Sequence, residues 1–213
     1  MTWQRARSEE QKEQRISEIV HATARLYSKH RFEEISFTLI AREAGFTRSN
    51  LYKYFSCKEE IFLAFLKQDI IAWRKDLVKS FSGRKSHSAE TIASLWVESL
   101  LRHRRLLDLL SVMPSFLEKH VTEERLVDFK RCANDELQVL SELLCRTFGA
   151  LTPEKVGEFV ELQMATAIGL YQITNLSEVQ EKVLEYPEFR HMKADFKGCL
   201  QKAVEYFLQG LTT

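Results

Sequence analysis

The stretch FTLIAREAGFTRSNLYKYFSCKEEIF, residues 37–62, decides the fold because it places two short helices on either side of a tight turn. Apolar residues spaced one and four apart predict a first helix over about residues 38–44. Gly45 follows and favours the left-handed conformation that ends a helix, since a residue without a Cβ adopts it at little cost. The hydroxyl of Thr47 is placed to cap a second helix. Together these signals predict a helix-turn-helix.

The second helix is expected over residues 48–54. Leu51 and Phe55 are four apart and are expected to face the core. The remaining arc would face solvent and consists of Arg48, Ser49, Asn50, Tyr52, Lys53 and Tyr54. In the major groove of DNA, Arg and Lys pair with guanine edges, Asn pairs with adenine, and hydroxyl groups bind phosphates. The outward face therefore suits double-stranded DNA.

The distribution of charge supports the same interpretation. Between Thr38 and Lys58 the chain has four basic residues and one acidic residue, Glu43, although the net charge of the whole chain is only +1. Positive charge is thus concentrated where a phosphate backbone would lie. A short polar helix between two apolar helices is also typical of a plain solvated surface, so the pattern alone leaves both interpretations open.

Several separated groups of residues resemble, in their order and spacing, the amino-terminal domain of the tetracycline-repressor (TetR) family of transcriptional regulators. The resemblance covers roughly residues 16–65 and rests on Phe32, Ile40-Ala41, Ala44-Gly45-Phe46-Thr47, Leu51-Tyr52, Tyr54-Phe55 and Lys58-Glu59. It implies an all-helical homodimer in which each subunit places its third helix in the major groove. It also implies a larger carboxy-terminal domain that binds a ligand and dimerises.

The resemblance also implies roles for individual residues. Those that would read bases are Arg48, Ser49 and Lys53, and those that would bind phosphates are Thr47, Tyr52, Tyr54 and Lys58. Thr38 and Asn50 belong to the same DNA-binding surface, with a less defined role. Cys57 departs from the family pattern, in which a small polar residue is usual, and raises a question about thiol chemistry.

Composition indicates an all-α protein. The chain has 213 residues, of which 45% are hydrophobic and 29% charged, with only three prolines and seven glycines and no long period-two alternation. We expect an amino-terminal three-helix, helix-turn-helix DNA-binding domain over residues 1–60. A larger helical ligand-binding and dimerisation domain is expected over residues 61–213. The near-neutral total charge disfavours a non-specific nucleic-acid coat, which would be basic throughout.

The cysteines are scattered and form no Cys-x-x-Cys pair, which disfavours a zinc site; they are Cys57, Cys132, Cys145 and Cys199. No metal and no cofactor are expected. The sequence shows neither a secretory signal nor an apolar run of about 18 residues, so we expect a cytoplasmic protein with free thiols and no membrane partner. A redox role for Cys57 would require a depressed pKa, without which the thiol is inert.

The remaining chain is predicted to form helices joined by short connections. We expect a frayed basic arm over residues 1–8, a bracing helix over 9–30, and one long helix over 58–81 that links the two domains. The polar residues 82–88 predict a loop. A rigid helix shared by both domains would convert ligand binding into a change in the spacing of two recognition helices.

Aromatic, Met and His residues of the carboxy-terminal region are candidates for an effector cavity, and these are Trp96, His103, Met113, Phe116, Phe129, Met164 and Tyr171. Small-molecule sites are mostly apolar with a few polar groups. The competing interpretation is that residues of these types at helical spacing belong to the core. The basic run Arg-His-Arg-Arg, residues 102–105, suits an anionic effector or a solvated helix end.

Two long segments near the carboxy terminus are the expected dimer surface. The first covers about residues 153–171 and the second about residues 193–210. Small residues that permit close helix approach in the first segment are Ala165, Ala167 and Gly169. Two such helices from each subunit would form a four-helix bundle. A monomer would also bury these apolar stripes, so periodicity leaves the matter open, and the family resemblance favours the dimer.

The expected function is that of a sequence-specific, ligand-responsive transcriptional regulator, a repressor rather than an activator, which binds an inverted-repeat DNA operator as a homodimer. Its effector is an unidentified small molecule. The chain contains no Gly-x-Ser-x-Gly, phosphate-binding glycine loop or His-Glu-x-x-His motif, which disfavours an enzyme. The remaining alternative is a helical protein-interaction module without specific DNA binding, whose affinity would respond weakly to salt.

Overall fold

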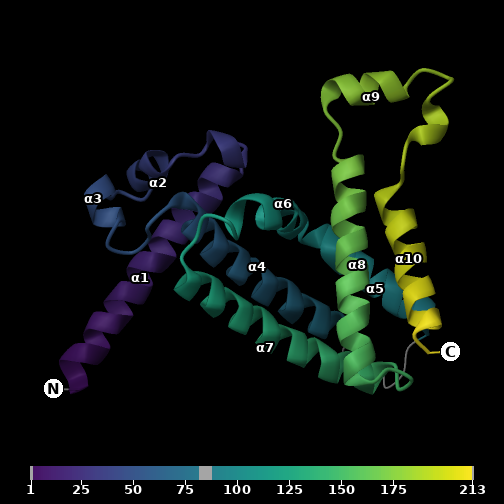
Figure 1. The fold of residues 1–213 in the computed structure, drawn as a ribbon, viewed down its shortest axis with the longest axis horizontal. Helices are drawn as coiled ribbons and strands as arrows, with labels where there is room; N and C mark the ends of the chain where they lie inside the picture. Colours follow the sequence, from purple (N-terminus) through teal and green to yellow (C-terminus); the bar gives the residue numbers. More distant parts are fainter. Residues whose placement is uncertain (1, 82–87, 213) are drawn as a thin grey trace. The chain divides into compact units, whose positions relative to one another are not determined.

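A computed structural model describes the backbone of residues 2–81 and 88–212, and within these residues every regular element is helical (Figure 1). The α-helices are α1 Thr2–Tyr27, α2 Phe37–Glu43, α3 Arg48–Leu51, α4 Lys58–Ser80, α5 Ala89–Arg102, α6 Arg104–Val112, α7 Glu123–Thr147, α8 Pro153–Thr174, α9 Glu178–Leu184 and α10 Phe196–Gly210. The shorter turns are the 3-10 turns η1 Phe32–Glu34 and η3 Arg190–Met192 and the π-helical turn η2 Met113–Leu117. The all-α prediction is confirmed.

The helix ends differ from expectation at two places. α1 begins at Thr2, so the arm expected over residues 1–8 is helical from Thr2 onward, and this stretch contains no Gly or Pro to break the helix. Most of the loop expected over residues 82–88 lies outside the described residues, and Ser88 Oγ caps α5 by accepting a hydrogen bond from the Thr91 amide at 3.2 Å. In the described part of the chain, no helix combines the length and apolar character needed to span a bilayer.

The chain divides into two compact units. The first unit contains Met1–Gln68 together with Val112–Arg131, and the second contains Asp69–Ser111 together with Cys132–Thr213. The division falls within α4 and within α7, each of which contributes residues to both units. The amino-terminal helices are thus packed with a segment that is distant in the sequence, which residue periodicity did not indicate.

The core of the first unit contains aromatic and branched side chains from α1 to α4. The ring of Phe62 makes edge-to-face contacts with Tyr27 and Phe32, at centroid distances of 5.4 and 4.8 Å. Further core residues of this unit are buried, namely Ile35, Ile40, Leu51, Phe55 and Ile61. Phe37 is half-buried, with its ring centroid 4.7 Å from that of Tyr52. Tertiary packing therefore supports α3, which is too short to be stable alone.

Local hydrogen bonds define the helix-turn-helix. Thr47 Oγ1 caps α3 by accepting a hydrogen bond of 3.2 Å from the backbone amide three residues on. Gly45 has a φ of 73°, so the left-handed turn residue is confirmed. α3 ends at Leu51, earlier than the helix predicted over residues 48–54. The reason is that the Tyr54 amide donates to the Leu51 carbonyl, three residues back, which is the bond of a tighter 3-10 turn.

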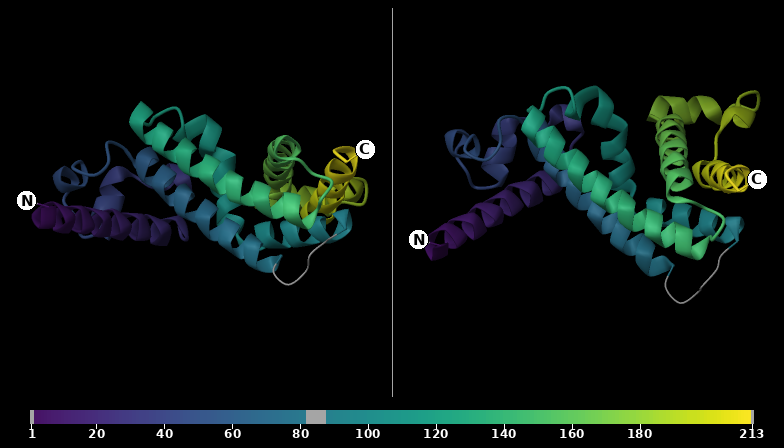
Figure 2. Two further views of the ribbon diagram at one scale, coloured as in Figure 1. Left: turned by 90° about the horizontal axis from the view of Figure 1, so that it is seen from below. Right: turned by 60° about the horizontal axis from the view of Figure 1, so that its bottom comes forward.

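The second unit is built around Trp96 of α5, which is fully buried. Its ring makes edge contacts with Trp73 of α4 and Phe159 of α8, at centroid distances of 5.3 and 5.1 Å. The Trp96 Nε1 group donates to Oε1 of the buried Gln163 at 2.7 Å, so the indole N–H is satisfied. α10 packs against α5 and α8, and Figures 1 and 2 show α8 and α10 side by side, with α9 and η3 in the connection between them.

Candidate nucleic-acid interface

The outer face of α3 and the turn after it carry the residues expected to read bases. Arg48, Ser49 and Lys53 are exposed, and 49% of Tyr52 is exposed. Arg48 Nη2 donates to the Tyr52 hydroxyl at 3.0 Å, and the guanidinium carbon lies 5.6 Å from the centre of the Tyr52 ring. The Tyr52 ring in turn lies against Phe37 of α2. These contacts hold a cation in a defined position at the solvent-facing surface.

Hydroxyl and amide groups extend this surface. Thr47 Oγ1 and Ser49 Oγ lie 3.1 Å apart, and both side chains are exposed at the start of α3. Thr38 is exposed on α2, whereas Asn50 is half-buried. Exposed hydroxyl groups of this kind donate to phosphate oxygens. The residues predicted to contact DNA, from Thr38 to Lys58, all fall within the first unit.

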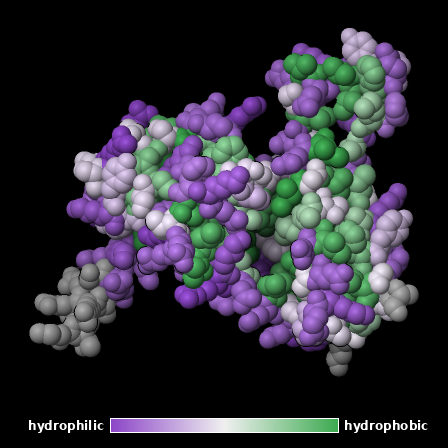
Figure 3. Space-filling view, viewed as in Figure 1, coloured by the Kyte–Doolittle hydropathy of each residue, from purple (hydrophilic) through white to green (hydrophobic). Residues whose placement is uncertain are grey.

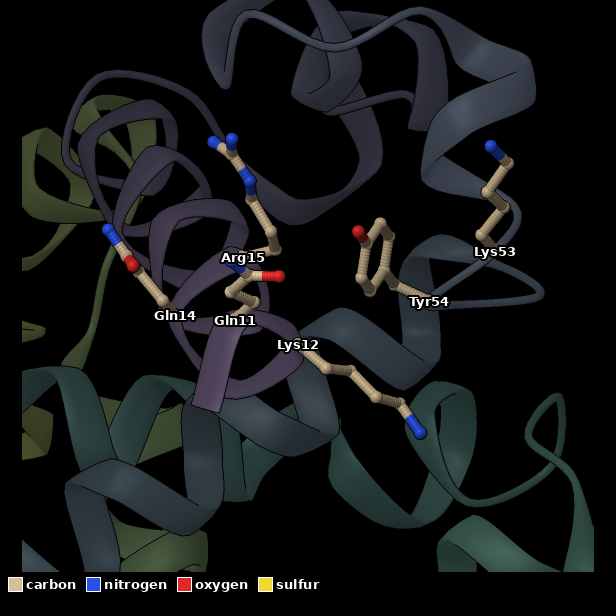
Figure 4. A pocket seen from close by; sticks show the side chains of 6 residues that line it. All are labelled: Gln11, Lys12, Gln14, Arg15, Lys53 and Tyr54. Atoms are coloured by element: carbon tan, nitrogen blue, oxygen red, sulfur yellow. The ribbon is translucent and has the colours of Figure 1, made fainter. Parts of the chain in front are cut away.

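A polar cavity of about 560 Å³ lies between α1 and the turn that follows α3. Its lining residues are Gln11, Lys12, Gln14 and Arg15 of α1 together with Lys53 and Tyr54. Figure 4 shows the last two across the cavity from the α1 residues. Three lining side chains are cationic and none is acidic, although Arg15 also pairs with Glu18 at 2.7 Å. A phosphate group placed here would meet positive charge from two structural elements.

Sequence reasoning did not predict the contribution of α1. The residues of α1 that line the cavity lie one, three and four positions apart and therefore share one face of the helix. Glu9, Glu10 and Glu13 occupy the same stretch of sequence, so the sequence shows no excess of positive charge there. Only the packing of α1 against the rest of the first unit separates the basic face from these acidic residues.

Lys58, which the resemblance assigns to a phosphate, also makes contacts inside the protein. Its Nζ donates to the Phe32 and Ile35 carbonyl oxygens, both at 2.9 Å, and lies 4.2 Å from the centre of the Phe32 ring. A lysine ammonium has three N–H groups. Two of them are therefore used inside the protein, which leaves one for a phosphate.

A second long-range network supports the turn after α3. Glu60, only 3% exposed, accepts hydrogen bonds from the Ser56 amide at 2.8 Å and from the Thr122 hydroxyl at 3.0 Å. Arg125 Nη2 donates to the Tyr54 carbonyl at 2.6 Å. The partners in these last two contacts are 62 and 71 residues apart in the sequence. No local pattern signals such pairs, so Glu60, Thr122 and Arg125 were missed.

The Cys57 thiol is half-buried and donates to the His120 carbonyl, with 3.3 Å between sulfur and oxygen. Burial raises the pKa of Cys57 from 9.0 to about 11. Because only the thiolate reacts, we expect Cys57 to be alkylated at pH 7 about a hundredfold more slowly than in the urea-unfolded chain. Timed iodoacetamide labelling with peptide mass spectrometry measures the ratio. Labelling at equal rates in the folded and unfolded chains would contradict this expectation and reopen a redox role.

The residues expected to line an effector cavity fall into both compact units. Met113, Phe116 and Phe129 belong to the first unit, whereas Trp96, His103, Met164 and Tyr171 belong to the second. Trp96 and Phe129 are buried, as core residues are, and Phe116 is 42% exposed. Met113 and Met164 are half-buried. His103 follows the last residue of α5, and its Nε2 lies 3.5 Å from the carboxylate of Asp76 on α4.

A small cavity of about 170 Å³ lies within the second unit, among α5, α6, α8 and α10. Its lining residues are Leu101, Arg104, Leu107, Tyr171, Thr174, Asn175 and Phe196. Tyr171 was among the predicted effector contacts, and Arg104 belongs to the basic run 102–105. The lining thus mixes apolar side chains with one cation and further polar groups.

Two family models match the chain. Residues 19–65 match the model described as bacterial regulatory proteins, tetR family, and residues 67–213 match the model described as the tetracyclin repressor-like C-terminal domain. The chain is also 25% identical over 202 residues to YfiR of Bacillus subtilis, which is described as an uncharacterized HTH-type transcriptional regulator; the match covers 93% of each chain.

Solved structures share the fold. The fatty acid degradation regulator FadR from Bacillus halodurans matches with a TM-score of 0.58 at 13% identity, over 92% of this chain and 95% of its own. The repressor AlkX from Dietzia sp., implicated in the biodegradation of n-alkanes, matches with a TM-score of 0.55 at 14% identity, over 92% of this chain and 97% of its own. At these identities the likeness concerns the fold alone.

Proposed function

Because the chain belongs to the TetR family of bacterial regulatory proteins, we propose that it is a sequence-specific, ligand-responsive transcriptional repressor that binds an inverted-repeat operator as a homodimer. The observation that carries this proposal is the exposed cationic and hydroxyl face of α3, held in place by the contact between Arg48 and Tyr52. A surface of this kind suits the major groove of DNA. We place its action in the cytoplasm, with the DNA that it binds.

Most residues of the interface have a proposed role. Arg48, Ser49 and Lys53 read base edges, and the phosphate contacts come from Thr47, Tyr52, Tyr54, Lys12 and Arg15. Lys58 would add one N–H to a phosphate while its other two stay with backbone carbonyls. Thr38 and Asn50 lie on or beside the same surface with undefined contacts. Residues 1–60 are proposed as the DNA-binding domain and 61–213 as the effector and dimerisation domain.

The proposed dimer forms through α8 and α10. One face of α8 is exposed along Leu162, Ala165, Gly169 and Ile173, and Figure 3 shows apolar surface running along this part of the chain. A Cβ built at Gly169 would meet no atom within 4 Å, so the packing of a single chain does not require a glycine there. Small side chains on an exposed helix face suit a second helix at close range.

The purified protein is used to capture sheared genomic DNA, and the bound fragments are sequenced. The same experiment with variants of single interface residues tests the proposal. Wild-type protein is expected to enrich a few fragments that carry an inverted repeat. Lys53→Ala should lower the ratio of specific to non-specific affinity about tenfold, because one base contact is lost. Lys12→Gln should instead weaken binding to all sequences and reduce the dependence of log affinity on log salt by about one.

A matched control for these variants is Lys75→Gln, which removes an exposed lysine from α4 in the second unit. It should leave enrichment and salt dependence unchanged. If Lys53→Ala and Lys12→Gln behaved like this control, the proposed reading surface would be wrong. If the wild-type protein bound DNA without sequence preference and bound a protein partner in a salt-insensitive manner, the interaction-module alternative would replace the proposal.

A further inference from the structure

The basic run of residues 102–105 contains three arginines, and the structure distinguishes them by their partners. Arg102 donates to Asp76 Oδ2 from Nη2 and Nε, at 2.8 and 3.0 Å. Arg105 donates to the two carboxylate oxygens of the buried Asp69 at 2.8 and 2.5 Å. Arg104 is exposed and, among the described residues, has no carboxylate within 4.0 Å. Arg104, the arginine of this run without an ion pair, also lines the small cavity of the second unit.

Apolar and polar side chains both line this cavity. Leu101 and Leu107 line it from α5 and α6, and the rings of Tyr171 and Phe196 meet edge to face with their centroids 6.0 Å apart. Because Arg104 both lines the cavity and is exposed, it lies at the mouth. The site thus combines a cation at its entrance with three apolar side chains and with two polar ones near the end of α8, which suits a ligand with one anionic end and a short apolar body.

The acidic residue nearest along the helix, Asp108, lies one turn after Arg104. Its carboxylate is half-buried and accepts a hydrogen bond from the Tyr171 hydroxyl. Burial raises the pKa of Asp108 above its ordinary value, and the charge of Arg104 opposes this shift only in part. Asp108 is therefore engaged with Tyr171 rather than paired with Arg104, and its charge remains close to the mouth of the cavity.

We propose that the cavity among α5, α6, α8 and α10 binds a small organic carboxylate, whose carboxylate group pairs with Arg104 and whose apolar body lies against Leu107 and Phe196. This inference rests on the proposed function, because it names the chemical class of the effector. A carboxylate fits the planar guanidinium in a two-bond geometry. A phosphate dianion fits less well, because the lining offers only one cation for its two negative charges.

The volume of the cavity limits the size of the ligand. A water molecule occupies about 30 Å³ in the liquid, so 170 Å³ accommodates about six groups of that size. Butyrate has six non-hydrogen atoms and is the probe of choice. Butyramide has the same number of non-hydrogen atoms and nearly the same shape without the charge, which makes it a matched control.

Ligand-detected NMR titration of the full chain tests the site. Butyrate is expected to bind at least about tenfold more tightly than butyramide, and Arg104→Met should remove this advantage, since a hydrogen bond to a charged group is lost. Arg102→Met removes the same charge from the same run but leaves the cavity lining intact, and should change butyrate affinity less than about twofold. Asp108→Asn keeps an acceptor for Tyr171, removes the nearby negative charge, and should strengthen binding severalfold.

The outcomes separate this inference from the proposed function when the same variants are tested for binding to an enriched genomic fragment. Specific DNA binding without a preference for butyrate over butyramide, or with equal losses in Arg104→Met and Arg102→Met, would overturn the carboxylate site and leave the regulator intact. If butyrate binding depended on Arg104 but the protein did not bind DNA, the regulator proposal would be wrong instead. Arg104-dependent binding that also changes DNA affinity would support both.

Discussion

Replacement of Lys58 by methionine is expected to lower the free energy of unfolding of the first unit by about 2–3 kcal/mol. The Lys58 ammonium donates to the carbonyl oxygens of Phe32 and Ile35 at the 3-10 turn η1, and methionine offers no donor to either. The favourable position of the ammonium at the Phe32 ring is lost as well. Methionine keeps most of the apolar stem, so the effect reports the lost donors rather than lost packing.

Urea denaturation followed by circular dichroism measures this effect. Lys67→Met is the matched control, because Lys67 lies on the same helix and pairs at 2.9 Å with Asp128, whose side chain is 65% exposed. That surface pair should contribute less than about 1 kcal/mol. If the two variants were equally stable, the Lys58 ammonium would lie in solvent and its role would be that of a direct phosphate contact.

This prediction changes how DNA-binding experiments on Lys58 are interpreted. A variant that weakens η1 also disturbs the support of the helix-turn-helix, because Phe32 and Ile35 are core residues of the same unit. Loss of DNA affinity in a Lys58 variant would then follow from structure and from a missing phosphate contact together. Lys12 and Lys53, which are exposed, separate these causes more cleanly.

Substitution of Ala165 by glutamate is expected to dissociate the proposed dimer into monomers and to lower the affinity for an inverted repeat by about a hundredfold or more. Ala165 is exposed on α8, so the change should not affect the folding of a single chain. In the proposed dimer it would bury a charge without a partner, which costs several kcal/mol. A monomer would also lose the gain from engaging two half-sites at once.

Sedimentation velocity and binding to paired and single half-sites measure the two effects. Val139→Glu on α7 is the control, because this valine is 38% exposed and lies away from α8 and α10 in the sequence. It should remain dimeric with unchanged affinity. A dimeric Ala165→Glu variant would show that the chains associate through another surface.

Local signals in the sequence were sufficient for the helix-turn-helix. Gly45 takes the left-handed conformation, and Thr47 caps α3 through its hydroxyl. Both features involve residues within a few positions of each other, so their physical causes can be read along the chain. The end of α3 was predicted less accurately. The choice between an α-helix and a tighter turn over the last few residues depends on how Leu51 and Phe55 pack into the core.

Small residues of α8 show the limit of sequence periodicity. Ala165, Ala167 and Gly169 were predicted together as positions of close helix approach. The structure buries Ala167 inside the second unit and leaves Ala165 and Gly169 exposed. Residues two apart point in different directions on a helix. Which direction faces the core depends on the neighbours against which the helix packs, here α5 and α10 among others.

The sequence by itself determined the helical class, the helix-turn-helix and the basic character of residues 102–105, because capping, turn geometry and periodicity act over a few residues. Tertiary structure decided which cations have partners. Lys58 donates to carbonyl oxygens at η1, and Arg102 and Arg105 pair with carboxylates of α4. Arg104 lines a cavity instead. Ion pairs and hydrogen bonds act over a few ångströms in space, and only folding brings groups that are distant in the sequence within that range.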